Sequence, residues 1–292
     1  MIAFGVSVSE AEAFRRYTQP GIELAREQDS VVLAFAAVDT VARSNNLILD
    51  AAAREPELEA LVLLHPHAEI RDREFCATIR AVLADPEVAV VGCAGGRPAP
   101  TLAWWEGAVA AGDVVHAYNE HGSGELPAYS WSARQAPPAE VDAVDPWVLV
   151  LSRWGVQNLR FDEELVLGHG AEVDLCWAAR AAGKKVVVAD LSVIEHRTVA
   201  LVDDVELWAQ AHIALARKWA PDAPQEQWRA RARRAEAERE ALRIQAFFGR
   251  VNYDTQIEAL ERELARKTST LSWRATQPLR TFNHWRRQRS AG

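Results

Sequence analysis

The chain has 292 residues, of which 49% are hydrophobic and 25% are charged, enough for one large α/β domain with an appendage or for two modest domains. Its formal net charge of −8 at pH 7 excludes nucleic-acid binding as the function of the whole molecule. Neither a signal peptide nor an apolar run of the roughly 18 residues that a membrane span needs is visible, which favours a cytoplasmic protein. The cysteines Cys76, Cys93 and Cys176 are far apart in apolar surroundings, so we expect buried thiols in a reducing compartment.

The first hundred residues alternate between apolar, strand-like runs and helix-like runs. We expect strands at 2–8, 31–38, 58–65 and 88–96, and helices at 10–27 (interrupted by Pro20-Gly21), 44–54 and 72–83, with Asp72 as the N-cap of the last helix. This rhythm predicts a parallel sheet that is covered by helices on both faces.

Residues 97–140 break the alternation, because they are rich in Gly, Pro, Ser and aromatic residues. We expect this segment to be a long irregular binding loop or lid. Its Trp104-Trp105 pair could stack on a sugar or a base, although a tryptophan pair more often packs in a core. A strand at 146–153, a helix at 172–182 and a strand at 184–196 restore the pattern.

The carboxyl-terminal part is predicted to be a helical extension, with helix-like composition from 205 to 264. Beyond Glu263 there is no acidic residue, whereas arginine and lysine recur to Arg289. Such a basic tail on an acidic body is usually solvated charge, and otherwise indicates an anionic surface or partner.

Two groups of polar side chains follow expected strands. The run LVLLH ends in His65-Pro66-His67, with Glu69 two residues further on, and alternate residues of an extended chain point the same way. Two imidazoles and a carboxylate suit Zn²⁺ or Mn²⁺ better than Mg²⁺, or else the imidazoles only cap loop carbonyls. Glu195-His196 ends another strand, where a histidine is usually structural.

Glu172 and Asp174 open a predicted helix. Acidic residues are common there, because the helix dipole favours negative charge at its amino end. By themselves the two residues do not distinguish a catalytic site from an ordinary helix start.

The order of elements and three segments, RFDEE (160–164), GHGAEVDLCWAARAAGKKVVVAD (168–190) and IEH (194–196), resemble a family-2-type glycosyltransferase with the GT-A fold of the nucleotide-diphospho-sugar transferase superfamily. The resemblance covers residues 2–198. It implies a Rossmann-like, mostly parallel sheet flanked by helices in a domain at 1–200, an acceptor-side loop at 97–140 and a helical extension at 201–292. The segment STLSWRATQPLR (269–280) is similar to a tag at the carboxyl end of many bacterial glycosyltransferases.

The resemblance also implies roles for individual residues. Glu172 falls at the catalytic base and Asp174 at the acid that braces its helix. The residues that the resemblance places at the donor nucleotide sugar are Asp39, Arg43, Asn46, His65 and His67. Those that it places at the acceptor are Trp104, Trp105 and His169. A metal ion such as Mn²⁺ would be bound by His67 and His196.

One position departs from the family pattern. His67 stands where these enzymes carry a metal-binding aspartate, and a neutral imidazole offers one nitrogen and no charge. Three alternatives follow. The enzyme binds a metal ion only weakly or works without one, or it binds a softer metal through His67 and His196, or it has lost activity.

The function implied by the resemblance is inverting transfer of a hexose or deoxyhexose from a UDP-, GDP- or dTDP-sugar to a saccharide or lipid-linked acceptor, in cell-surface polysaccharide assembly. The carboxyl-terminal helices would touch the inner face of the membrane or pair into a homodimer. The alternative is a non-catalytic sugar- or nucleotide-binding module, which the altered metal motif favours and the Glu172–Asp174 pair opposes. A nucleotidyltransferase is disfavoured, because no Gly-rich phosphate loop follows residues 2–8.

Overall fold

The computed structural model describes residues 1–36, 38, 40–104, 109–118, 129–132, 138–165, 169–197, 205–219 and 227–269. The chain divides into two compact units, Met1–Ala246 and Phe247–Gly292.

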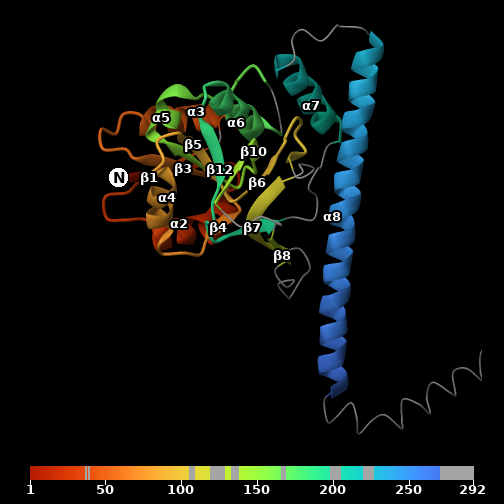
Figure 1. Ribbon diagram of the computed structural model, residues 1–292. Helices are drawn as coiled ribbons and strands as arrows, with labels where there is room; N and C mark the ends of the chain where they lie inside the picture. The colour runs from red at the N-terminus through yellow and green to blue at the C-terminus, as the bar shows by residue number, and fades with distance from the viewer. Residues whose placement is uncertain are drawn as a thin grey trace, which may run out of the picture. The chain divides into compact units, whose positions relative to one another are not determined.

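A seven-stranded sheet forms the centre of the first unit (Figure 1). Its strands, in spatial order, are β2 (Val31–Ala36), β1 (Ile2–Val8), β3 (Ala60–Leu64), β11 (Val148–Ser152), β5 (Val88–Gly92), β12 (Lys185–Val188) and β9 (Ala139–Val141). Strands β11 and β9 run antiparallel to their neighbours and the other five share one direction, so the expected mostly parallel sheet is confirmed. Continuous apolar runs such as ALVLL of β3 are buried along their whole length, as strands covered on both faces require.

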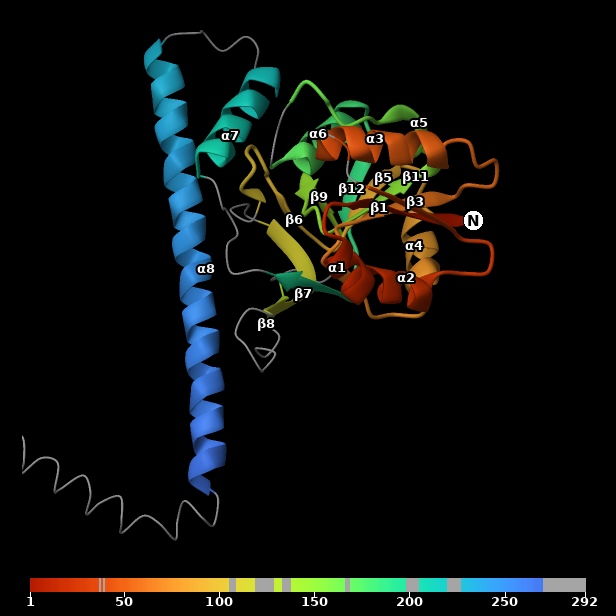
Figure 2. The same cartoon turned by 180° about the vertical axis from the view of Figure 1, so that it is seen from behind.

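Helices cover both faces of this sheet, as the two views show (Figures 1 and 2). One face carries α3 (Val41–Ala52), α5 (Arg153–Asn158) and α6 (Ala171–Ala181); the other carries α2 (Gln19–Ala25) and α4 (Phe75–Leu83). The expected N-cap at Asp72 is wrong: α4 begins after Glu74, and the Asp72 carboxylate accepts the Glu74 N–H in a turn ahead of the helix. Pro20-Gly21 does not interrupt its helix either, because Pro20 lies in the first turn of α2, where its missing N–H is tolerated.

A second sheet contains β10 (Ala143–Val144), β6 (Ala94–Arg97), β7 (Val109–Tyr118), β13 (Val193–Arg197) and β4 (Ala68–Ile70), with β8 (Tyr129–Ser132) paired to β7. The expectation of an irregular segment at 97–140 is therefore wrong for β7 and β8. The single strand expected at 184–196 is two strands in different sheets, because the chain turns at Asp190, whose carboxylate accepts the Ser192 N–H. The strand expected at 88–96 likewise divides into β5 and β6.

The carboxyl-terminal part is helical, as expected, in α7 (Val205–Trp219) and α8 (Gln227–Ser269). Among the described residues, no helix combines the length and apolar character needed to cross a membrane. The three cysteines are buried and free, which confirms the expected buried thiols.

Candidate functional site

The carboxyl ends of five parallel strands meet at one edge of the seven-stranded sheet. His65 follows β3 there, and Glu10 lies just beyond β1. Helix α6 leads directly into β12, so its first turn, with Glu172, belongs to the edge where β12 ends. Ligands of open α/β sheets bind at this edge, and it therefore carries the candidate site.

The backbone of the His-Pro-His segment is fixed on both sides. The N–H of His65 donates to the carbonyl of Trp147 at 3.0 Å. The hydroxyl of Thr18 hydrogen-bonds to the carbonyls of His65 (3.1 Å) and Pro66 (2.7 Å). Thr18 ends a π-helical turn, Phe14–Thr18, and such turns frequently occur at functional sites.

His196 is buried and oriented by two neighbours. Its ring stacks on Tyr17, with 3.8 Å between the ring centroids and 10° between the planes. Its Nε2 atom lies 2.6 Å from Oε2 of Glu69, whose other oxygen accepts from Arg71 at 2.7 Å. The stacking on Tyr17 and the contact with Glu69 together fix the orientation of the His196 ring.

His67 contacts a different carboxylate. Its Nε2 atom lies 3.2 Å from Oε1 of Glu10, and its ring centroid is 5.4 Å from that of His65 and 6.3 Å from that of Tyr17. The N–H of His196 donates to the carbonyl of His67 at 2.9 Å, so the two residues are neighbours through their backbones.

The described residues do not fit a divalent metal ion. No group of three or more His, Cys, Asp or Glu side chains within them is placed to hold one. The Nε2 atoms of His67 and His196 each contact a separate carboxylate. Asp39, the remaining acidic residue expected near the donor, lies outside the described part of the chain.

Glu172 lies in the first turn of α6. Its side chain keeps partial exposure, yet burial among protein atoms raises its pKa to about 7, while backbone N–H groups of Glu172 itself and Gly170 oppose that rise. A carboxyl that is buried but still reachable can exchange protons with a bound ligand near neutral pH. This is the property that a general base requires.

Gly170 sets the start of α6. Its φ of +84° lies in the left-handed region, and a Cβ at this position would lie 2.2 Å from Cδ2 of Leu102 and 3.0 Å from Cδ1 of Leu215. Glycine satisfies both restraints, so Gly170 fixes the backbone from which Glu172 projects.

Asp174 faces α7 rather than solvent. Only 2% of the residue is exposed, and its two oxygens accept from Nε1 of Trp219 and Nζ of Lys218, both at 2.8 Å. Lys218 also binds Asp162, in the RFDEE segment, at 2.7 Å. Asp174 therefore joins α6 to α7, and the role that the resemblance implies for it stays a prediction.

Asn46 and Arg43 lie on α3. The amide of Asn46 donates to the carbonyl of Phe161 (2.9 Å) and to Glu163 (2.8 Å), and accepts the Phe161 N–H (3.0 Å), so Asn46 holds the RFDEE segment. Arg43 is exposed in the first turn of α3, where its N–H donates to the N-cap Thr40 at 3.2 Å.

The two described residues among the three expected near the acceptor lie in different surroundings. Trp104 is only 6% exposed, so its side chain packs in the core. His169 is half-buried and meets the edge of Trp208, on α7, with ring centroids 5.4 Å apart. Trp105 lies outside the described residues.

Sequence reasoning missed Tyr17, Glu10, Lys218 and Trp219. Tyr17 and Glu10 precede His65 by more than 40 residues, and no local pattern links them to it. Lys218-Trp219 ends an amphipathic helix, and a lysine and an indole there predict only a helix terminus.

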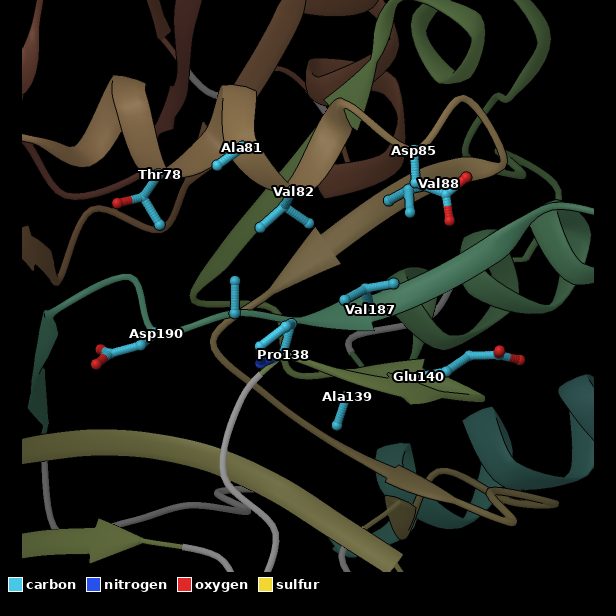
Figure 3. Close-up of a pocket in the computed structure, with 11 residues that line it drawn as sticks. Thr78, Ala81, Val82, Asp85, Val88, Pro138, Ala139, Glu140, Val187 and Asp190 are labelled. Carbon is cyan, nitrogen blue, oxygen red and sulfur yellow. The ribbon is translucent and has the colours of Figure 1, made fainter.

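An open groove of about 560 Å³ lies on the α4 face of the sheet (Figure 3). Val82 on α4, Val88 on β5 and Val187 on β12 contribute to its largely apolar lining. None of the expected site residues lines this groove, so we locate the candidate site by its side chains and not by the groove.

No family model matches the chain, and a comparison with known proteins gives a sequence relative. The streptomycin biosynthesis protein StrF of Streptomyces griseus is 34% identical over 203 residues, which are 67% of this chain and 66% of that protein. The aligned part is thus slightly less than two thirds of the relative's length.

Solved structures with a related arrangement include a mannosyltransferase, PcManGT from Pyrobaculum calidifontis, in complex with GDP-Man and Mn²⁺ (13% identity, 96% of this chain and 84% of that one, TM-score 0.47). GalNAc-T7 with UDP, GalNAc and Mn²⁺ gives 8% identity, 81% and 54% coverage and a TM-score of 0.46. TarS of S. aureus gives 11% identity, 81% and 42% coverage and a TM-score of 0.45. At these scores the likeness carries no conclusion about function.

Proposed function

We propose that this chain is a GT-A-type glycosyltransferase that moves a sugar from a nucleotide-diphospho-sugar to a saccharide or glycoconjugate acceptor. The observation that carries the proposal is Glu172, a reachable carboxyl with a pKa of about 7 at the edge of the sheet where ligands bind. The resemblance of the segments around Glu172 to family-2-type glycosyltransferases supports the same role.

In the proposed step, the Glu172 carboxylate takes the proton of an acceptor hydroxyl while that oxygen forms a bond to the anomeric carbon of the donor sugar. The bond between the anomeric carbon and the diphosphate oxygen breaks, and the nucleoside diphosphate leaves with the electron pair. Attack from the face opposite the leaving group inverts the anomeric configuration. A base with a pKa near the working pH is suited to this proton transfer.

The leaving diphosphate gains negative charge, and nearby positive charge lowers the barrier. Arg43 is proposed to supply positive charge at this edge, and His67 and His196 to donate hydrogen bonds to the diphosphate. Because the described residues do not form a metal site, we route no step through a metal ion. Whether transfer requires Mn²⁺ or another divalent ion is to be tested.

The donor is proposed to be a UDP-, GDP- or dTDP-sugar of the hexose or deoxyhexose class. The acceptor is a saccharide or lipid-linked glycan in cell-surface polysaccharide assembly, and the similarity to a streptomycin biosynthesis protein adds small-molecule acceptors to those to be tried. Histidine at position 67 and the lack of a described metal cluster favour one alternative, a non-catalytic nucleotide- or sugar-binding module.

Calorimetric titration with UDP, GDP and dTDP, each with Mn²⁺ and again with chelator, tests the proposal. We expect one nucleotide to bind and to stay bound in chelator. Transfer from the matching sugar nucleotide should then be lost in Glu172→Gln while nucleotide binding is kept. Binding without transfer in the unaltered protein would establish the non-catalytic module, and absence of binding would overturn both proposals.

The second unit contains the end of α8, and we propose that it pairs with a second copy of the chain. Tyr253, Ile257, Leu260 and Leu264 recur at intervals of four, three and four residues and are 53–67% exposed. This is the spacing of a coiled-coil seam, and Ile257 and Leu260 at successive seam positions favour two strands. The alternative is that the same stripe binds a cytoplasmic protein to the inner face of a membrane.

A further inference from the structure

Two side chains in the last turn of α7 bind both carboxylate oxygens of Asp174, which lies two residues after Glu172. Asp174 accepts from Trp219 Nε1 and from Lys218 Nζ, and almost none of the residue is exposed. A buried carboxylate that is paired and doubly hydrogen-bonded defines a single arrangement of the two helices, because losing either partner leaves a buried acceptor unsatisfied.

Lys218 binds a second carboxylate in a separate segment. Asp162 accepts from its Nζ at 2.7 Å, and Phe161, one residue earlier, is held by Asn46 on α3. Burial lowers the pKa of Lys218, but the hydrogen bonds that its ammonium donates to Asp162 and Asp174 outweigh this effect and raise that pKa overall. The ammonium therefore stays charged at neutral pH and joins the RFDEE segment to α6.

Trp219 extends the connection to a third segment. Its ring meets the edge of Trp177, on α6, with centroids 5.9 Å apart and an interplanar angle of 84°. The Nε1 of Trp177 donates to the carbonyl of Ala99 at 3.1 Å, in the segment that leads to Trp104. The end of α7 thus contacts α6 at two residues, Asp174 in the turn that holds Glu172 and Trp177 in the next turn, and Trp177 in turn binds the backbone at Ala99.

We infer that Lys218 and Trp219 are positioning residues for Glu172, so that α7 belongs to the catalytic unit. The inference rests on the proposed function. Lys218 and Trp219 hold the first turn of α6 and the RFDEE segment in one arrangement without touching the substrate. General-base catalysis depends on placement within about 1 Å, and an error of that size reduces rates by roughly 100-fold.

Lys218→Met, Lys218→Arg and Trp219→Phe in the full chain test the inference. Lys185→Met is the matched control, because Lys185 also pairs with a carboxylate, Asp85, at 2.7 Å, but at the amino end of its strand. We expect kcat to fall about 100-fold in Lys218→Met with donor Kd changed less than about threefold. Lys218→Arg, which keeps the charge, should recover most of the rate, and Lys185→Met should match the unaltered protein.

Hydrogen exchange of residues 171–175 gives a readout that needs no activity. We expect these amides to exchange at least about tenfold faster in Lys218→Met than in Lys185→Met. Unchanged kcat or unchanged exchange in Lys218→Met would overturn the inference, as would equal losses of kcat and donor affinity, which indicate general destabilisation. If the unaltered protein transfers no sugar, the proposed function fails alone, and exchange still decides whether Lys218 holds α6.

Discussion

Oε2 of Glu69 lies 2.6 Å from Nε2 of His196, although 127 residues separate the two in the chain. Antiparallel pairing of β4 with β13, in which Glu69 stands opposite Ile194, produces this contact. Glu69 is therefore the partner of His196 and not a third ligand beside His65 and His67. The contact gives the buried His196 ring a carboxylate partner that fixes its orientation.

Glu69→Gln is expected to weaken binding of the donor's nucleoside diphosphate by roughly three- to tenfold, because a neutral amide forms a weaker hydrogen bond with His196 than a carboxylate does and holds its ring less firmly. Titration calorimetry measures the change. Arg71→Ala is the control, since Arg71 contacts the same carboxylate from the exposed side, and it should change the affinity less than about twofold. Equal effects of the two variants would contradict the role given to His196.

Glu172 should make both turnover and stability depend on pH. Turnover should rise as pH increases through about 7, because only the carboxylate can accept the acceptor's proton. Stability should change in the opposite direction. The folded protein keeps the Glu172 proton to a higher pH than the unfolded chain does, so the free energy of unfolding falls between pH 4.5 and about 7.

Glu172→Gln removes this group from both profiles. The variant should be more stable than the unaltered protein at pH 8, by an amount on the order of 3 kcal/mol, and similar to it below pH 4.5. Thermal unfolding across pH 4–8 provides the measurement. A stability difference that does not grow with pH would show that Glu172 titrates normally.

Gly170→Ala is expected to lower the free energy of unfolding by about 3 kcal/mol or more, since the new methyl group would overlap Leu102 in a left-handed backbone. Gly183 is a matched control: its φ is +79°, but nothing lies within 4 Å of the position of a Cβ. Gly183→Ala should therefore cost only about 1–2 kcal/mol, the backbone term alone. Denaturant unfolding compares the two, and equal losses would mean that Leu102 moves aside freely.

Asn46→Ala should lower the free energy of unfolding by about 2–3 kcal/mol, because it leaves the N–H and carbonyl of Phe161 without their partner. The neighbouring Asn45, half-buried on the same helix, offers Asn45→Ala as a comparison with an expected change under about 1 kcal/mol. Nearly equal values would show that the RFDEE segment does not depend on Asn46.

The sheet was predictable from the sequence because its central strands are continuous apolar runs that only two-sided burial explains, as in Ala60–Leu64. The division of the run at 184–196 was not, since it depends on one turn at Asp190 that sends β13 to another sheet. Glu172 was identified by the resemblance around it, whereas its raised pKa follows from burial that no local pattern contains. The contacts of Tyr17 with His196 and of Lys218 with Asp174 join residues far apart in the sequence, and the periodicity of a single segment does not predict such contacts.

The exposed stripe on the end of α8 gives the last prediction. If Tyr253, Ile257, Leu260 and Leu264 form a coiled-coil seam, sedimentation should show a dimer of the full chain at micromolar concentration. The double change Ile257→Lys with Leu260→Lys should make it monomeric, because charge at two adjacent seam positions cannot be buried. Arg262→Glu alters a residue that pairs with Glu258 outside the stripe, and it should leave the dimer intact. A monomer that instead floats with vesicles of anionic lipid, and loses this in the double variant, would assign the stripe to a membrane surface.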